Sequence, residues 1–117
     1  MINILNIVYT LLKEFSLPIY LQGSMAEDEQ YPDQFFTYWI VDSEGNSFYD
    51  DQDHSTDWSI NLAFYTNDMN NMNPIITELI VKLKAKGFKV QGKGFLTLSD
   101  EPTHTGWIVE ALYSEQN

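Results

Sequence analysis

The densest group of chemically capable side chains lies at residues 50–57, where four aspartates, a histidine, a serine and a threonine fall within eight positions. Alternate positions carry oxygen donors, as the first ligands of a calcium-binding loop do: Asp51, Asp53, Ser55 and Asp57. Counted from Asp51, the sixth position is Thr56 instead of glycine, and the twelfth is Leu62 instead of glutamate. The calcium motif fails at both diagnostic positions. The segment is therefore interpreted as a solvated acidic loop, with a looser cation site as the alternative.

The two histidines, His54 and His104, are the candidates for a general base or a metal ligand. Neither lies in a recognised catalytic or ligand spacing. His104 shares a turn with Asp100 and Glu101, and a hydrogen bond to such a neighbouring carboxylate accounts for it without catalysis. The chain has no cysteine and no G-x-S-x-G pentapeptide. We therefore predict no catalytic residue, no metal site and no cofactor, and we expect that the chain is not an enzyme.

A lysine between two glycines, Lys93 between Gly92 and Gly94, is a further pattern that could bind a phosphate. It has neither the spacing of a phosphate-binding loop nor a helix after it. Glycines inside a strand mark a bulge or a close approach of two backbones. We predict one of these two features here.

The elements that would position these residues begin with an amphipathic helix at residues 2–15, whose apolar side chains recur three and four positions apart. Pro18 is expected to end this helix. Residues 22–34 mix glycine, serine, acidic residues and proline, which predicts a loop. No apolar run approaches the roughly 18 residues of a membrane span, so a soluble intracellular protein is expected.

Four strands are predicted from residue type and alternation. The first covers residues 35–41, and a turn at residues 42–46 leads back into residues 47–49. Residues 58–65 alternate apolar and polar side chains and form the second strand. Two further strands are predicted at residues 88–98 and 107–113.

A second helix is predicted at residues 74–86. Pro74 would occupy its first position, where the missing N–H has no helical acceptor in any case. Glu78 and Lys82 are four residues apart and should pair, and Gly87 supplies the left-handed residue that ends the helix.

Together these elements predict a single α+β domain over residues 1–117. The predicted architecture is a two-layer sandwich in the order α-β-β-α-β-β, with a mostly antiparallel four-stranded sheet and two helices packed on one face. Aromatic residues make up 15% of the chain, and some of them must then lie on the open face of the sheet. Exposed aromatic patches mark protein interfaces, which favours an assembling protein.

The charge of the chain is strongly acidic and uneven. Seventeen Asp and Glu against six Lys and Arg give a net charge of −11. Residues 1–60 hold eleven carboxylates and one lysine, a balance of −10, whereas residues 61–117 hold six carboxylates and five lysines, a balance of −1. Such a surface repels phosphates, so ordinary nucleic-acid binding is disfavoured.

Several stretches of the chain resemble a family of small phage and prophage tail proteins: residues 49–58, 64–68, 83–88, 92–94 and 99–106. The run Asp-Glu-Pro-Thr-His-Thr-Gly at residues 100–106 is the most specific of them. The resemblance covers about residues 30–115. The family is that of the tail-completion, or tail-terminator, proteins of long-tailed phages.

This resemblance implies a ring of identical subunits, hexameric in the tail-terminator group, that caps the tail tube and later meets the head connector. The implied partners are copies of the chain, tail-tube proteins and head-connector proteins, without a membrane, in the host cytoplasm during assembly and then in the virion tail. An acidic inner wall would let DNA pass without binding. The candidate interface residues are in loops: Tyr49, Asp50, Asp51, Asp53, His54, Asp100, Glu101 and His104.

Two other functions stay open at this point. In a DNA-mimic inhibitor, the carboxylates would stand in for phosphates and occupy a host DNA-binding protein, although the nearly neutral second half argues against this. In a metal-dependent enzyme, the centre would be formed by Asp50, Asp51, Asp53, His54 and His104.

Overall fold

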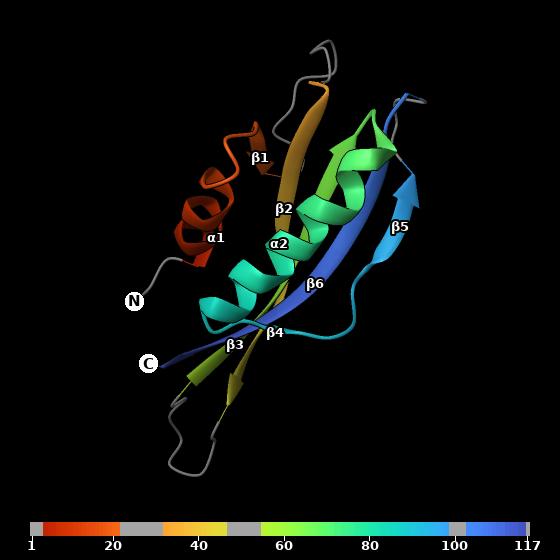
Figure 1. The fold of residues 1–117 in the computed structure, drawn as a ribbon. Coiled ribbons are helices and arrows are strands. Elements are labelled where there is room, and N and C mark those ends of the chain that lie inside the picture. Colours follow the sequence, from red (N-terminus) through yellow and green to blue (C-terminus); the bar gives the residue numbers. More distant parts are fainter. Residues whose placement is uncertain (1–3, 22–31, 47–54, 99–102, 117) are drawn as a thin grey trace.

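The computed structural model describes residues 4–21, 32–46, 55–98 and 103–116, and it shows two α-helices packed on one six-stranded sheet (Figure 1). The elements follow one another as α1 (Ile4–Lys13), β1 (Ile19–Leu21), β2 (Gln34–Asn46), β3 (Ser55–Thr66), the 3-10 turn η1 (Met69–Asn71), α2 (Met72–Ala85), β4 (Lys89–Val90), β5 (Phe95–Leu98) and β6 (Thr105–Gln116). The predicted α+β class is confirmed. Neither described helix has the length and apolar character that crossing a membrane requires.

The strands lie in the order β1-β2-β3-β6-β4, and β5 pairs with β6 along the same edge as β4. Only β1 and β2 are parallel among the described pairs, so the sheet is mostly antiparallel, as predicted. The predicted number of four strands is wrong. Because β3 and β4 are both antiparallel to β6, α2 connects two parallel strands that have β6 between them.

The N-terminal helix ends earlier than predicted, and a strand that was not predicted follows it. α1 ends at Lys13, five residues before Pro18, and Ser16 turns the chain with a φ of 58°. β1 then pairs parallel to β2, and the N–H of Phe36 donates to the carbonyl of Pro18 at 2.9 Å. A strand of three residues is too short for its own alternation to reveal it.

β2 and β3 form a hairpin that extends well beyond the predicted strands. Residues 42–46 continue β2 and pair with residues 55–59, so the prediction of a turn there is wrong. Pairing with β3 overrides the low strand propensity of these residues. A bulge between Ile40 and Asp42 leaves Val41 as the extra residue. The predicted return at residues 47–49 lies outside the described residues.

The predicted strand at residues 88–98 is two short strands, β4 and β5, with a break at residues 91–94. Gly92 and Gly94 adopt positive φ angles of 68° and 88° in this break. A Cβ atom on Gly94 would collide with the backbone carbonyl oxygen of Ile108 in β6. The predicted close approach of two backbones is therefore confirmed, and it interrupts the strand.

α2 begins before its predicted start. Asp68 accepts a hydrogen bond from the N–H of Asn70 at 3.0 Å and caps η1, which runs into α2 at Met72. Pro74 is therefore the third residue of α2 and not the first. The third position also has an N–H without a helical acceptor, so proline is tolerated there.

The end of α2 agrees with the prediction. Gly87 has a φ of 93°, its N–H donates to Lys84, and the N–H of Phe88 donates to the carbonyl of Leu83 at 3.0 Å. This is the double hydrogen bond by which a left-handed glycine closes a helix. Lys82 lies 3.9 Å from Glu78, as predicted, and 3.3 Å from Glu14, which follows α1.

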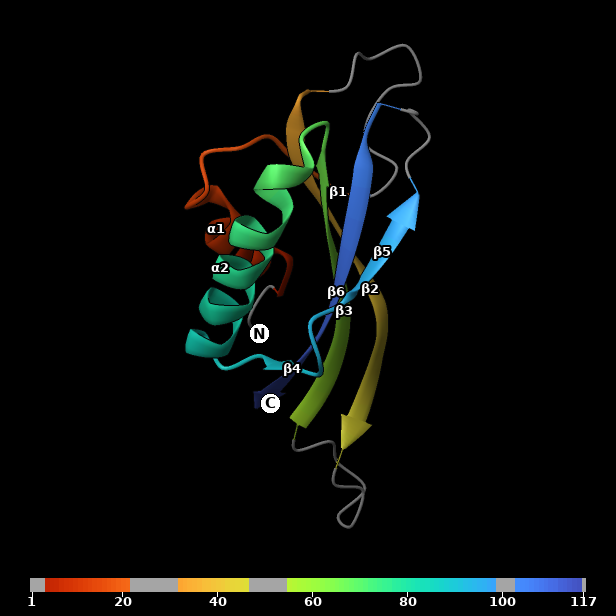
Figure 2. The same ribbon diagram turned by 45° about the vertical axis from the view of Figure 1, so that its right-hand side comes forward.

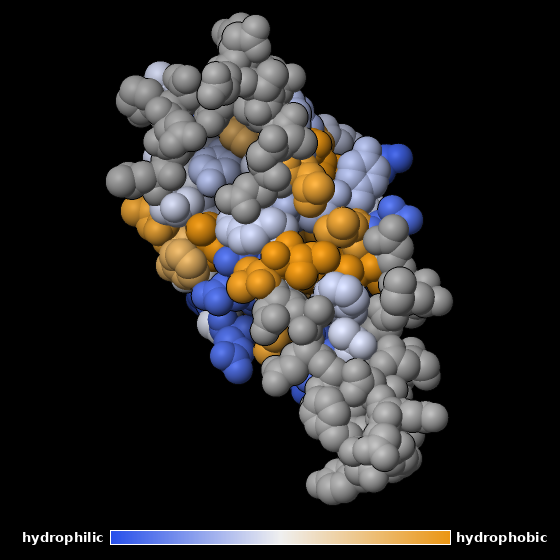
Figure 3. All heavy atoms as spheres, turned by 180° about the vertical axis from the view of Figure 1, so that it is seen from behind, coloured by the Kyte–Doolittle hydropathy of each residue, from blue (hydrophilic) through white to orange (hydrophobic). Residues whose placement is uncertain are grey.

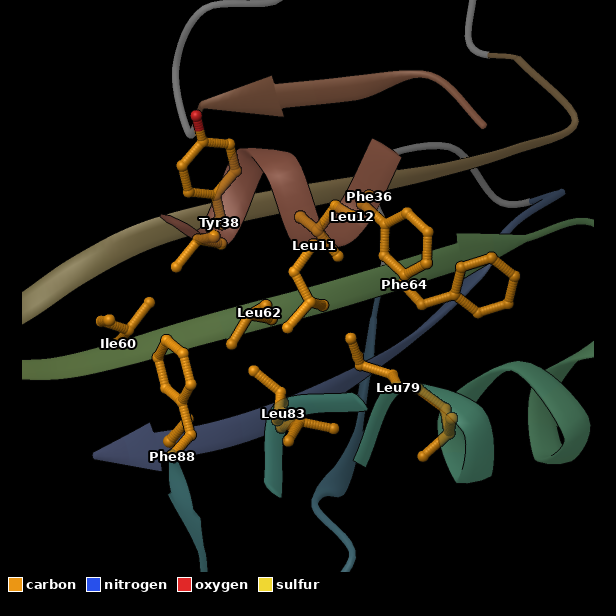
Figure 4. Close-up of a cluster of buried hydrophobic side chains, with 14 of the residues drawn as sticks. Leu11, Leu12, Phe36, Tyr38, Ile60, Leu62, Phe64, Leu79, Leu83 and Phe88 are labelled. Carbon is orange, nitrogen blue, oxygen red and sulfur yellow. The ribbon is translucent and has the colours of Figure 1, made fainter. Parts of the chain in front are cut away.

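The core fills the space between the two helices and one face of the sheet. Both helices lie on the same side (Figure 2). Leu11 and Leu12 of α1, and Leu79 and Leu83 of α2, are fully buried against β2 and β3 (Figure 4). Full burial of one such side chain contributes about 1.5–3 kcal/mol. The other face of the sheet has no described helix over it.

Candidate functional site

Seven of the eight candidate interface residues lie outside the described part of the chain: Tyr49, Asp50, Asp51, Asp53, His54, Asp100 and Glu101. The interpretation of residues 50–57 as an acidic loop is tested only at its end, where residues 55–57 begin β3. In the described part of the chain, no three His, Asp or Glu side chains are grouped closely enough to hold a metal ion.

His104, the eighth candidate, is buried immediately before β6. Its Nε2 lies 2.7 Å from the carbonyl oxygen of Pro32, and its Nδ1 lies 2.9 Å from the hydroxyl of Thr103. A carbonyl accepts only, so Nε2 carries a proton and donates. His104 thereby ties the segment before β2 to the turn before β6. The predicted carboxylate partners, Asp100 and Glu101, are not among the described residues.

The helix-free face of the sheet is the side away from α1 and α2, and an apolar band crosses it (Figure 3). By register, it carries residues 35, 37 and 39 of β2, 59, 61, 63 and 65 of β3, and 106, 108, 110 and 112 of β6. Val41, the extra residue of the bulge, lines a hollow on this face together with Ser59 and Leu112. Three large apolar side chains are well exposed there: Val41 at 55%, Phe95 at 46% and Leu112 at 39%. A monomer gains nothing by showing these side chains to water, so the face is a candidate docking surface.

A shallow hollow of about 290 Å³ lies on this face. Val41, left over by the bulge in β2, and Leu112 line it together with Ser59. Lys89 and Glu110 contribute one charge of each sign. The hollow is thus lined by both apolar and polar residues, and its two charges cancel, unlike those of the acidic chain as a whole.

One end of the helix-free face is fixed by packed rings. Phe35 is buried, and its ring stacks on Tyr65 at 5.1 Å and meets Tyr20 edge-on at 5.9 Å. Gly106 makes room for this packing, because a Cβ atom there would collide with the Tyr65 ring and lie 2.7 Å from the methyl group of Thr97. The aromatic residues predicted on the open face are therefore partly a second, small core.

A groove of about 670 Å³ lies on the helix side of the sheet, between α2 and the β4–β5 connection. No described helix lies over β5 (Figure 1). The groove walls are largely apolar: Met69, Met72, Ile76, Ile80, Val81, Val90 and Trp107. Val81 is 61% exposed and Met69 is 54% exposed. We call this feature the α2 groove.

The charged residues that line the α2 groove are both basic. Five of the six lysines lie at residues 82–93, and two of them, Lys84 and Lys93, line the groove. No Asp or Glu is among the residues that line it. The groove thus combines apolar walls with two exposed positive charges in a chain of net charge −11.

Two contacts with β6 hold the β4–β5 connection, which forms the wall of the groove opposite α2. The indole N–H of Trp107 donates to the carbonyl of Lys93 at 2.6 Å, and Gly94 lies against β6. These contacts fix the β4–β5 connection, so the groove is formed before anything binds.

The sequence alone does not predict this groove. One indication of the groove lies in the sequence of α2. Ile76 and Ile80 continue the apolar stripe of this helix that faces the core, and Val81 adds an apolar side chain outside that stripe. The position of the β4–β5 connection could not be read from that indication, because it depends on pairing with β6.

The chain matches no protein-family model, and it matches no curated protein sequence.

Proposed function

We propose that this chain is a structural subunit that assembles with copies of itself through the helix-free face of its sheet. The observation that carries the proposal is the exposure of Val41, Phe95 and Leu112 on that face. Apolar side chains in a band, on a rigid sheet, are what a protein interface requires. An isolated exposed residue would carry no such meaning.

The resemblance to phage tail-completion proteins gives this assembly a biological role. We propose a ring, hexameric if the resemblance holds, that caps the tail tube and joins it to the head connector. The ring would assemble in the host cytoplasm and remain in the virion tail. It would let DNA pass without binding it, because carboxylates offer DNA no counterion-release gain.

Electrostatics constrain how such copies meet. Each copy carries −11, so two copies repel one another at distances of about a Debye length, roughly 8–10 Å. Association must therefore come from short-range apolar contact. The near-neutral hollow beside Val41 and Leu112 is where such contact is opposed least.

Light scattering across a concentration series, combined with negative-stain imaging, tests the proposal. We expect a molar mass that rises with concentration to a fixed multiple of the 13.6 kDa chain, with ring-shaped particles. A chain that stays monomeric at millimolar concentration and high salt contradicts self-assembly. Dimers without rings would contradict the tail role but would agree with self-association through the helix-free face.

The net charge of −11 supports a second candidate function, an acidic DNA-mimic inhibitor of a host DNA-binding protein. The basic α2 groove argues against it, because a mimic needs a continuous negative surface. A pull-down from host extract that recovers DNA-binding proteins would favour the mimic. Recovery of tail-tube or connector subunits would favour the structural role.

A further inference from the structure

We infer that the α2 groove is a second docking site, separate from the helix-free face, and that it receives an amphipathic helix of another protein whose polar side carries carboxylates. The inference rests on the shape of the groove, on its apolar walls and on the sign of the charge at its rim. It does not depend on whether copies of the chain assemble.

The shape of the groove suits a helix. The helical layer of this fold covers only part of the sheet: α1 lies on the β1 side, and α2 crosses β3 and β6. Beyond α2, towards β4 and β5, the next place in that layer is empty of described helix and is occupied by the groove. Helices pack side by side on a sheet about 8–10 Å apart, so a third helix would continue the layer.

The walls of the groove suit an apolar helix face. Ile76 and Ile80 line the groove from α2, and Val90 and Trp107 line it from the sheet. Met69 and Met72 stand at one end, and methionine side chains adapt to different apolar partners. Recognition of a helix in a groove needs such a row of apolar contacts, met by anchors at i, i+3, i+4 and i+7.

The charge at the rim selects the partner. Lys84 on α2 and Lys93 on the β4–β5 connection are both exposed, on opposite sides of the groove. A helix lying between them could place a carboxylate near each ammonium group. A basic helix would be favoured by the −11 charge of the whole chain at long range, but it would face two lysines at contact.

This contrast gives a test in which net charge and local charge predict opposite results. The probes are three designed peptides of about 14 residues, the length of α2, with leucines at i, i+3, i+4 and i+7. Their polar positions carry glutamate, glutamine or lysine. Amide and indole N–H signals of the ¹⁵N-labelled chain are followed by NMR during titration, and the dissociation constants are compared at about 0.15 M salt.

We expect the glutamate peptide to bind more tightly than the glutamine peptide, and the glutamine peptide more tightly than the lysine peptide. The expected difference between the first two is about twofold to thirtyfold, from two partly exposed ion pairs. The largest shifts should fall on Val81, Lys84 and Lys93 and on the Trp107 indole. Tightest binding of the lysine peptide, or shifts confined to the helix-free face, would overturn the inference.

Variants of exposed residues locate the effect without disturbing the core. Lys84→Glu with Lys93→Glu should reverse the order of the three peptides, and Val81→Glu should weaken all of them at least tenfold. Val41→Glu, on the helix-free face, is the matched control and should leave binding unchanged. Thermal melting of each variant checks that it folds.

Two outcomes would contradict the inference directly. If none of the peptides shifts any groove signal at millimolar concentration, the groove is not a helix site. If unlabelled chain displaces the glutamate peptide, and Val81→Glu turns a self-associating chain into a monomer, a second copy is the occupant and not another protein.

Discussion

The helix-free face and the α2 groove are both uncovered parts of one sheet, yet they differ in breadth and charge. The helix-free face is broad, exposes Val41, Phe95 and Leu112, and has one charge of each sign beside its hollow. The α2 groove is narrow and has two lysines and no described carboxylate in its lining. We infer from this comparison that exposed apolar area makes each surface a candidate docking site, and that the charges around it select the partner.

Gly94→Ala should have the largest effect on stability, because Gly94 lets the β4–β5 connection, which forms one wall of the α2 groove, lie against β6. The new Cβ would meet the Ile108 carbonyl oxygen and lie 2.6 Å from the Trp107 Nε1, and the residue would be strained at a φ of 88°. We expect a loss of about 2–5 kcal/mol in the free energy of unfolding, measured in urea.

Gly92→Ala is the matched control for that variant. Gly92 has a φ of 68° but no atom within 4 Å of its would-be Cβ, so only backbone strain of about 1–2 kcal/mol is expected. Equal losses for the two variants would show that Gly94 does not hold the groove wall by close approach.

Gly106→Ala tests the other surface. The added methyl group would press on the Tyr65 ring and on Thr97, which belong to the packed end of the helix-free face. Both obstacles are side chains, which shift more readily than the backbone carbonyl that faces Gly94, so the expected loss is smaller than for Gly94, about 1–3 kcal/mol. A loss as large as that of Gly94→Ala in urea unfolding would mean that the two surfaces are equally rigid.

The salt dependence of self-association tests whether charge opposes or supports contact between copies. Copies of net charge −11 repel one another, so raising the salt from about 0.05 M to about 0.5 M should strengthen self-association several-fold in light scattering. Dissociation of the assemblies by salt would mean that opposite charges hold the copies together. The contrast between the two surfaces would then be wrong.

The smallest effect is expected on the covered side of the sheet, at Tyr38. Burial, with a smaller contribution from Tyr9, raises the pKa of Tyr38 above its ordinary value of 10.0. The unfolded chain releases this proton first, so the group's contribution to stability is complete below about pH 10 and is lost as the pH rises. Tyr38→Phe should lose less stability than the wild type between about pH 9 and pH 11 in urea unfolding. Parallel pH profiles would contradict this.

Much of the fold could be predicted because its signals are local. The apolar stripe of α1, the alternation in β3 and the stop at Gly87 each depend on residues close in sequence. The errors arise where distant pairing decides. β3 holds residues 42–46 in β2 against their turn-like composition, and β6 divides residues 88–98 into two strands at Gly94.

The candidate site was predictable to a smaller degree. The sequence predicted an open sheet face with some aromatic residues on it, and Phe95 is exposed there. It did not single out Val41, because the bulge that exposes Val41 depends on the register with β3. It also did not indicate that Phe35 is buried on the open face, since that requires the ring of Tyr65 from the neighbouring strand.

The central claim is that the helix-free face joins copies of this chain. The most direct test is the light-scattering mass of Val41→Glu with Leu112→Glu, compared with Val81→Glu in the α2 groove. All three side chains are exposed, so the folds should survive, as thermal melting will check. We predict that the double variant stays monomeric at concentrations where the wild type and Val81→Glu assemble. A double variant that assembles like the wild type would contradict the claim.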